Sequence, residues 1–264
     1  MISILTPTFN RQHTLSRLFN SLILQTDKDF EWIIIDDGSI DATAVLVEDF
    51  RKKCDFDLIY CYQENNGKPM ALNAGVKACR GDYIFIVDSD DALTPDAIKL
   101  IKESIHDCLS ENEKESFSGV GFRKAYIKGG IIGNDLNNSS EHIYYLNATE
   151  ISNLINGDVA YCFKKESLVK NPFPRIEDEK FVPELYIWNK ITDKAKIRFN
   201  ISKVIYLCEY LDDGLSKNFH NQLKKYPKGF KIYYKDQRKR EKTYIKKTKM
   251  LIRYLQCCYY EKIK

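Results

Sequence analysis

Three aspartates stand within four residues in the segment Asp88-Ser89-Asp90-Asp91. Carboxylates this close repel and raise one another's pKa unless a cation offsets their charge. A divalent ion of the magnesium type prefers oxygen ligands and commonly binds one or two carboxylates together with the phosphates of a substrate. The segment therefore predicts a site for a divalent metal and a phosphate group.

The other common metal-binding side chains show no comparable pattern. The eight cysteines include no Cys-x-x-Cys, and the four histidines have no ligand spacing. In a reducing compartment these cysteines are predicted to be buried or inert thiols rather than a zinc or redox site. We therefore expect any metal to be held by oxygen.

Polar residues also follow the other predicted strands of the first hundred residues. They lie in the segments 6–10, 36–39 and 64–68. Asp-Gly-Ser and Asn-Gly are ordinary turn sequences, so each segment alone is also explained by turn chemistry. In open α/β sheets, however, ligands bind beyond the carboxyl ends of the strands. We therefore expect aspartates, one lysine and one aromatic ring to converge on one edge of a sheet.

The elements that would position these residues are short apolar runs that alternate with helical patterns. Strands are predicted over residues 2–6, 32–36, 58–62 and 83–87, and helices over 15–23, 39–53 and 68–79. Asn10 is the predicted cap of the first helix, Ser39 or Asp41 caps the second, and Thr94-Pro95-Asp96 opens a fourth. Four such alternations favour a parallel sheet covered on both faces.

After about residue 116 this rhythm breaks. Strands are predicted over 117–127 and 159–163, one helix begins at Asn147, and another covers 181–191. The tail from residue 223 shows only weak helical patterning.

Charge is distributed unevenly along the chain. From Lys217 to Lys264 there are 16 Lys and Arg against 3 Asp and Glu, a local charge of +13, whereas the preceding 216 residues carry −9 and the whole chain +4. Basic residues interleaved with tyrosines fit a solvated face or attraction to an anionic membrane surface. Nucleic acid is not an expected partner, because the acidic body would oppose wrapping on phosphate.

The composition is that of an ordinary globular protein, with 264 residues, 44% hydrophobic and 30% charged. It argues against a disordered, collagen-like or disulfide-scaffold protein. The apolar runs are far shorter than the ~20 residues of a membrane-spanning helix. The amino terminus has no basic leader or long apolar stretch, so no signal peptide is predicted. We expect a cytoplasmic protein, with peripheral contact of the basic tail to the inner face of the membrane as an option.

Four motifs together resemble family 2 glycosyltransferases. They are Thr6-Pro7-Thr8-Phe9-Asn10-Arg11, Ile34-Ile35-Asp36-Asp37-Gly38-Ser39, Asn66-Gly67-Lys68 with Ala71-Leu72-Asn73-Ala74-Gly75, and Gly81-Asp82-Tyr83 leading into Asp88-Ser89-Asp90-Asp91. They occur in the family's order and at its spacing within residues 1–110. A dinucleotide site is disfavoured, because no Gly-x-Gly-x-x-Gly follows the first strand.

The resemblance implies the GT-A fold, an α/β architecture with a Rossmann-like mixed sheet flanked by helices. It implies a nucleotide-sugar-binding half over residues 1–110 and an acceptor and catalytic-base half of the same domain over 111–216. Residues 217–264 would then form a basic, Tyr- and Lys-rich extension.

The resemblance also implies roles for residues that bind the nucleotide base. Pro7, Thr8 and Phe9 match the edge where an aromatic ring stacks on uracil. Asp37 matches the carboxylate that accepts a hydrogen bond from the ring N–H of the base, and Asp36 stands beside it.

At the diphosphate, the resemblance places Lys68 as a cation close to the nucleotide and Ser89 in the nucleotide-binding turn. Asp88 and Asp90 match the Asp-x-Asp motif, of which Asp90 reaches the metal, Mn²⁺ or Mg²⁺. Such a cation would offset the charge on the departing nucleoside diphosphate.

The incoming hydroxyl must lose its proton, so a carboxylate base should face the anomeric carbon from the opposite side. The family usually has Glu-Asp here, with a tryptophan four residues after the Asp. Counting back from Trp188 places Glu184 on the base position and Pro183 on the preceding acid, which departs from the usual pair. Glu179 and Asp178 are the alternatives, and Glu184 is also explained as an acid at a helix N-terminus.

The leading hypothesis is a metal-dependent, inverting, hexosyltransferase-like enzyme. It would move a sugar from a UDP-sugar to a saccharide or lipid-linked acceptor in surface polysaccharide or glycolipid synthesis. The alternative is a nucleotide-sugar-binding member that has lost turnover, suggested by Pro183 before Glu184. A nucleotidyltransferase is disfavoured, because a Gly-rich basic loop at the amino terminus is missing.

Overall fold

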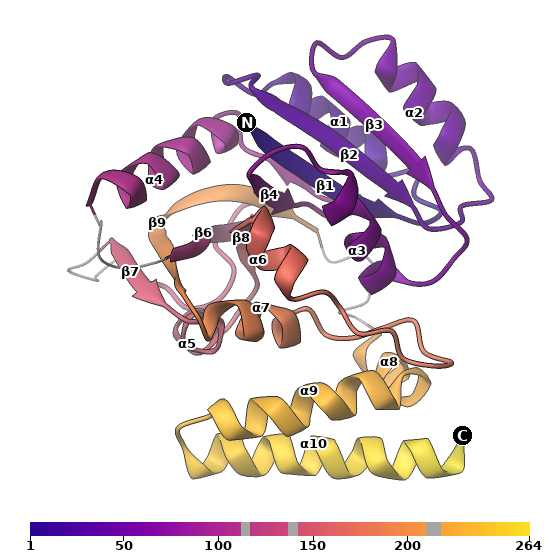
Figure 1. Ribbon diagram of the computed structural model, residues 1–264, viewed down its shortest axis with the longest axis vertical. Coiled ribbons are helices and arrows are strands. Elements are labelled where there is room, and N and C mark those ends of the chain that lie inside the picture. Colours follow the sequence, from indigo (N-terminus) through magenta and orange to yellow (C-terminus); the bar gives the residue numbers. More distant parts are fainter. Residues whose placement is uncertain (112–116, 137–141, 210–217) are drawn as a thin grey trace.

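The four strands predicted near the amino terminus form the parallel part of one large sheet (Figure 1). The computed structural model describes residues 1–111, 117–136, 142–209 and 218–264. β1 (Ile2–Thr8) pairs with β2 (Phe30–Asp36) and β4 (Tyr83–Ile86), and β3 (Asp57–Tyr62) pairs with β2, all in parallel. The parallel arrangement of these strands is therefore confirmed.

The second half of the chain extends this sheet in mixed directions. β8 (Val159–Lys164) runs antiparallel to β4, and β6 (Phe117–Tyr126) runs antiparallel to β8. β9 (Lys196–Cys208) lies parallel to β6 and also pairs with β5 (Ala92–Leu93) and β7 (Ile143–Leu146). Among the described residues the sheet has nine strands, in the order β3-β2-β1-β4-β8-β6-β9-β5 with β7 beside β9.

Helices cover both faces of the sheet, as the sequence predicts. Side chains of consecutive residues on a strand point to opposite faces, so Ile4 packs with the helices of one face and Leu5 with those of the other. The first face carries α1 (Leu15–Ile23), α2 (Thr43–Arg51) and α4 (Ala97–Glu111). The second face carries α3 (Lys68–Ala78), α5 (Ala148–Ile155), α6 (Lys165–Lys170) and α7 (Leu185–Thr192).

The predicted helix caps are confirmed at Asn147 and wrong at Asn10. Asn147 caps α5 in a complete capping box with Glu150. Asn10 does not cap α1, which has Thr14 at its N-cap position. The side chain of Asn10 instead accepts a hydrogen bond from the backbone of Ile40, because Asn10 lies too far ahead of the helix to reach its first turn.

The predicted helix over 181–191 begins later, at Leu185. Pro183 explains the delay, since a proline disfavours helical geometry at the residue before it, here Val182. The strand β9 was not predicted at all, although polar and apolar residues alternate over 196–202. This alternation is the signal that could have revealed it.

The basic tail forms three helices, α8 (Phe219–Lys225), α9 (Pro227–Arg240) and α10 (Tyr244–Ile263). In Figure 1, α9 and α10 lie side by side beneath α7. Their small core contains Leu223, Phe230, Tyr234 and Cys257. The division at residues 216 and 217 lies outside the described residues, and the domain boundaries stay predictions.

Buried hydrogen bonds join the tail to the body. Asn189 of α7 donates to Gln237 Oε1 of α9 at 2.8 Å, and Thr149 of α5 donates to Asn189 at 2.9 Å. All three side chains are buried. Within the described parts of the chain, no helix has both the length and the hydrophobicity needed to cross a membrane.

Glu31 on β2 is a fully buried carboxylate that fixes the segment ahead of β4. It accepts hydrogen bonds from the Ser3 hydroxyl at 2.5 Å and from Arg80 N and Nε, each at 2.6 Å. Burial would raise the pKa of Glu31, but these hydrogen bonds outweigh burial and lower it. Ionised Glu31 therefore stabilises the fold above its unfolded-state pKa of 4.5, and this contribution is lost as the pH falls through the lower folded-state value.

We expect Glu31→Gln to lower the free energy of unfolding by about 1–3 kcal/mol at pH 7, because buried donors lose an ionised acceptor. Urea denaturation at pH 7 and pH 4 measures this, and the gap to wild type should narrow at pH 4. Asp57→Asn is the control, because Asp57 binds the same Arg80 from an exposed position. A gap that is constant with pH would contradict the account.

Candidate active site

A cleft of about 1070 Å³ opens at the carboxyl edge of the parallel strands. Residues from the first hundred of the chain, from the loop before α7 and from α8 line it together. Ten of the twelve predicted site residues line this cleft: Pro7, Thr8, Phe9, Asp37, Lys68, Asp88, Ser89, Asp90, Asp178 and Glu184. Asp36 and Glu179 do not belong to the lining.

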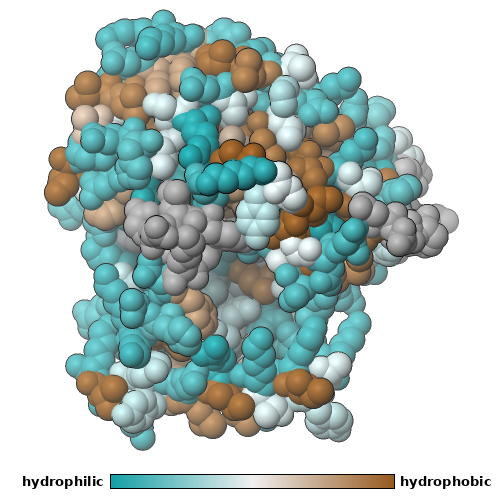
Figure 2. All heavy atoms as spheres, turned by 180° about the vertical axis from the view of Figure 1, so that it is seen from behind, coloured by the Kyte–Doolittle hydropathy of each residue, from teal (hydrophilic) through white to brown (hydrophobic). Residues whose placement is uncertain are grey.

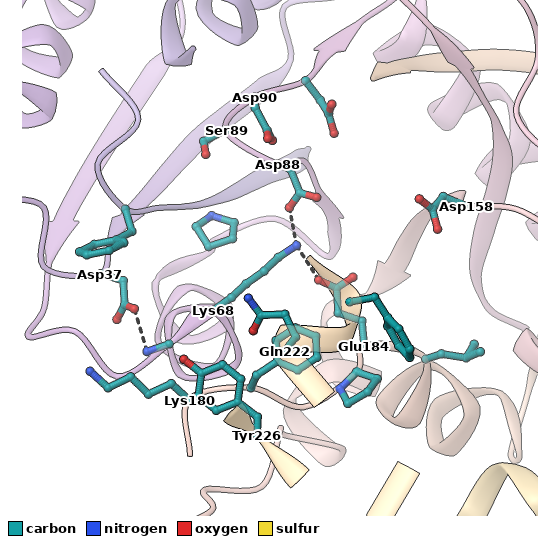
Figure 3. Close-up of a pocket in the computed structure, with 18 of the residues that line it drawn as sticks. Asp37, Lys68, Asp88, Ser89, Asp90, Asp158, Lys180, Glu184, Gln222 and Tyr226 are labelled. Atoms are coloured by element: carbon teal, nitrogen blue, oxygen red, sulfur yellow. Dashed lines mark hydrogen bonds and ion pairs between the residues drawn. The ribbon is translucent and has the colours of Figure 1, made fainter. Parts of the chain in front are cut away.

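At the centre of the cleft, Lys68 joins two carboxylates from distant parts of the sequence (Figure 3). Its Nζ lies 2.6 Å from Asp88 Oδ1 and 2.7 Å from Glu184 Oε1. Burial would lower the pKa of Lys68, but the charges of Asp88 and Glu184 outweigh it and raise the pKa. Lys68 is therefore a permanent cation between the predicted metal ligand and the predicted base.

The backbone before Lys68 requires glycine. Gly67 has a φ of +89°, and a Cβ there would lie 2.0 Å from the carbonyl oxygen of Lys180. No other residue fits this turn without displacing the 180 segment. Gly67 therefore allows α3 to begin at Lys68 with its side chain directed into the cleft.

Tyr206 of β9 holds the acidic turn after β4. This buried phenol donates to Asp91 Oδ2 at 2.7 Å and accepts a hydrogen bond from the backbone N–H of Asp88 at 2.9 Å. Asp91 is therefore bound to Tyr206, whereas Asp88 faces Lys68. The three aspartates of the cluster therefore have different environments.

The pKa values of these three aspartates differ in direction. Burial and then the neighbouring charge of Asp88 raise the pKa of Asp90, and the same two causes raise that of Asp91 to about 7. Burial would also raise the pKa of Asp88, but Lys68 and then Lys124 hold it below its usual range. Because Tyr206 already donates to Asp91, Asp90 is the carboxylate with a raised pKa that is left to be ionised by a cation in the cleft.

The residues at this turn fit a divalent cation that also needs ligands from a substrate. Throughout the described ranges, no three His, Cys, Asp or Glu side chains form a group that could hold a metal alone. The oxygens of Asp90 and Asp88 would supply part of the coordination shell, and diphosphate oxygens and water would complete it, as is usual for magnesium-type ions.

The two aspartates at the end of β2 point in different directions. Asp37 lines the cleft and accepts hydrogen bonds from the backbone N–H groups of Asn66 and Gly67 at 2.9 and 2.7 Å. Asp36 is buried beneath the turn, where it accepts from Ser39 N and the Tyr60 hydroxyl, each at 2.7 Å. Asp36 therefore supports the turn, and only Asp37 is placed to contact a ligand.

The three candidates for the catalytic base also have different surroundings. Glu184 occupies the N-cap position of α7 without a capping hydrogen bond from its side chain and contacts Lys68 instead. Glu179 accepts from Lys228 N and Gly229 N at 2.9 and 2.8 Å, so both oxygens serve the first turn of α9. Asp178 is exposed on the cleft wall in a left-handed conformation, with φ +64°.

Several cleft residues were not predicted. Lys124 of β6, Gln222 of α8 and Tyr226, the residue that follows α8, line the cleft. Tyr206 of β9 does not line it but holds the acidic turn that does. The alternation in β9 could have pointed to Tyr206, whereas no local pattern distinguishes the polar residues of α8 from solvated ones. Trp188 is almost fully buried and packs on Phe163, with ring centroids 4.7 Å apart.

Comparison with known proteins shows which proteins the amino-terminal part of this chain is similar to. Residues 3–110 match the model of glycosyl transferase family 2. A curated relative, the glycosyltransferase GlyA of Streptococcus pneumoniae, is 33% identical over 104 residues, which is 39% of this chain and 15% of GlyA. The family 2 glycosyltransferase resemblance of the amino-terminal motifs is thereby confirmed.

Solved structures extend the likeness of fold to nearly the whole chain. Residues 1–349 of S. aureus TarS in complex with UDP-GlcNAc match with a TM-score of 0.67 and 18% identity, covering 96% of this chain and 71% of that one. The mannosyltransferase PcManGT from Pyrobaculum calidifontis, in complex with GDP-Man and Mn²⁺, matches with a TM-score of 0.60 and 14% identity, covering 98% and 73%. The GT-A fold is confirmed.

The matching curated relatives are longer proteins. The chain covers only 15% to 34% of the length of the first eight. The family match is therefore limited to residues 3–110, and the activity of the chain is argued below from its own residues.

We expect Glu179→Ala to lower the free energy of unfolding by about 1–2 kcal/mol, because two N–H groups at the start of α9 lose their acceptor. Thermal or urea unfolding measures this loss. Glu177→Ala is the matched control, since its side chain is exposed and its backbone is not left-handed. Equal stability of the two variants would contradict the capping role of Glu179.

Proposed function

We propose that the protein is an inverting glycosyltransferase that moves a hexose-like sugar from a UDP-sugar to a saccharide or lipid-linked acceptor. The observation that carries this proposal is the placement of Asp88 and Glu184 on either side of Lys68. A predicted metal ligand and a predicted base thereby face the same space, as a displacement at a sugar carbon requires.

The donor edge supports a nucleotide. Phe9 lines the cleft with 46% of its surface exposed, so its ring is free to stack on a base. The buried hydroxyl oxygen of Thr8 has no hydrogen-bond partner among the described residues, although it belongs to the cleft lining. A ligand that supplies a hydrogen-bond partner would remove this cost. The UDP-GlcNAc complex of the similar TarS fold favours UDP as the nucleotide.

A divalent cation at the acidic turn would neutralise charge on the departing diphosphate. Asp90 and Asp88 are the residues that would hold it, and the Mn²⁺ in the PcManGT complex supports the same choice. Lys68 adds a permanent positive charge next to this position. Both charges favour release of a nucleoside diphosphate.

Glu184 is the proposed base. It would take the proton from the acceptor hydroxyl as the new bond to the anomeric carbon forms. The bond between that carbon and the phosphate oxygen breaks, and its electron pair leaves with the diphosphate. One displacement of this kind inverts the anomeric configuration. The cation of Lys68 keeps Glu184 oriented toward the cleft before the acceptor arrives.

The second candidate function is nucleotide-sugar binding without turnover. Pro183 stands where the resembling family has an acid, and the helix starts only after it. Metal-dependent UDP release in a panel of UDP-sugars would support the enzyme, whereas donor binding without release across the panel would support this alternative. The proposed setting, surface polysaccharide or glycolipid synthesis, rests on the family resemblance.

We expect Asp90→Ala to reduce Mn²⁺-dependent UDP release by about 100-fold or more, because charge on the leaving group loses its stabilisation. A coupled UDP assay measures release. Asp82→Ala removes an exposed aspartate that does not line the cleft and should leave the rate unchanged. Full activity of Asp90→Ala would contradict the metal assignment.

We expect Glu184→Gln to lower kcat for transfer by about 10²–10⁴-fold, the range of general base catalysis, with the Kd for UDP changed little. Single-turnover kinetics and calorimetry separate the two quantities. Asp178→Asn serves as the comparison, since it alters the other candidate on the cleft wall. If only Asp178→Asn abolished transfer, Asp178 would replace Glu184 as the base.

A further inference from the structure

The outer face of α10 carries a row of exposed apolar side chains, interrupted by the exposed Thr248. Its members are 52% to 84% exposed: Ile245, Ile252, Leu255, Tyr259 and Ile263. An α-helix turns by about 100° per residue, so these five positions fall within an arc of roughly 80–100°. They form one stripe, here called the α10 stripe, along the length of the helix.

The stripe is not the face that α10 uses for folding. Met250, Tyr254 and Cys257 project toward α9, and Cys257 is fully buried. By the same helical geometry, this packed face lies roughly opposite the stripe. Figure 2 shows hydrophobic side chains gathered along the lower edge of the molecule, the edge that α10 occupies in Figure 1.

Positive charge accompanies the stripe. The helix Tyr244–Ile263 contains five Lys and Arg residues and one acid, Glu261. Glu261 is paired with Lys231 of α9. Lys249 and Lys262 are exposed and fall at the two borders of the stripe. An apolar stripe between basic borders is the pattern of a helix that lies in a membrane interface.

We propose that α10 docks the protein flat onto an anionic lipid surface, with the α10 stripe in the acyl boundary and Lys249 and Lys262 at the headgroups. The positive charge of α10 favours an anionic lipid surface over a second copy of the chain. A second copy of the chain would place two helices with a net charge of +4 each against one another. An anionic bilayer instead attracts each of these cations.

The end of α10 reaches the cleft, which connects docking with the proposed function. Lys264 lines the cleft beside Lys225, and its Nζ donates to the carbonyl oxygen of Lys225 at 3.0 Å. The end of a docked α10 would therefore lie beside one wall of the cleft. On the proposed transferase function, on which this part rests, the acceptor is a sugar carried by a lipid.

The test is co-sedimentation of the full chain with vesicles of phosphatidylcholine alone or mixed with phosphatidylglycerol. Wild type should bind the mixed vesicles at least tenfold more strongly than the neutral ones, and binding should weaken as salt is raised. The double variant Ile252→Glu/Tyr259→Glu should lose at least tenfold in partitioning to the mixed vesicles.

Leu24→Glu/Val45→Glu is the matched control. It introduces the same two charges at residues that are each 65% exposed and lie elsewhere. This control should bind mixed vesicles as wild type does. Circular dichroism establishes that both variants fold, and UDP release from the soluble donor should be unchanged in both.

Equal binding of wild type to neutral and mixed vesicles would overturn the proposal, as would full binding by the stripe variant. A wild-type dimer that becomes monomeric in the stripe variant, without any vesicle binding, would assign the stripe to a second copy and also overturn it. Vesicle binding without UDP release would instead contradict the proposed function and leave the docking surface standing.

Discussion

The pair of contacts made by Lys68 connects the two halves of the cleft. A lysine at the start of α3 meets a carboxylate from the end of β4 and another from the N-terminus of α7. Without this cation, Asp88 and Glu184 would repel one another in a partly desolvated space. Three segments place the groups of this contact. The turn at Gly67 begins α3 at Lys68, the acidic turn after β4 carries Asp88, and the segment before α7 carries Glu184.

Much of the donor half could be predicted, because its signals are local. Apolar runs and turn residues located β1 to β4, and the clustered aspartates indicated the polar edge of the sheet. Neighbouring acids were harder to separate. Asp36 and Asp37 are adjacent, yet only Asp37 faces the cleft, because consecutive side chains leave a strand on opposite sides and the direction depends on the fold. Glu179 and Glu184 likewise differ in their partners, which are the start of α9 for Glu179 and Lys68 for Glu184. These partners are distant in sequence, so no local pattern reveals them.

The second half of the chain was less predictable because its elements depend on distant partners. β9 mixes apolar residues with buried polar ones such as Arg198, whose guanidinium donates a hydrogen bond to the Ser104 hydroxyl of α4 at 3.0 Å. Its partner β6 shifts register around Phe122 and Arg123. The helices of the tail carry many charges, and what stabilises them is a small shared core around Phe230 rather than a strong local pattern.

Tyr206 gives the sheet topology a further consequence. Tyr206 lies 96 residues beyond Ser110, the end of the segment that matches the family, yet its hydroxyl holds the aspartate turn. The donor half is therefore no self-sufficient module. A chimera that grafted residues 3–110 onto a foreign acceptor half would inherit every motif and still lack this contact, unless the new host supplied a hydroxyl at the equivalent place on its own strand.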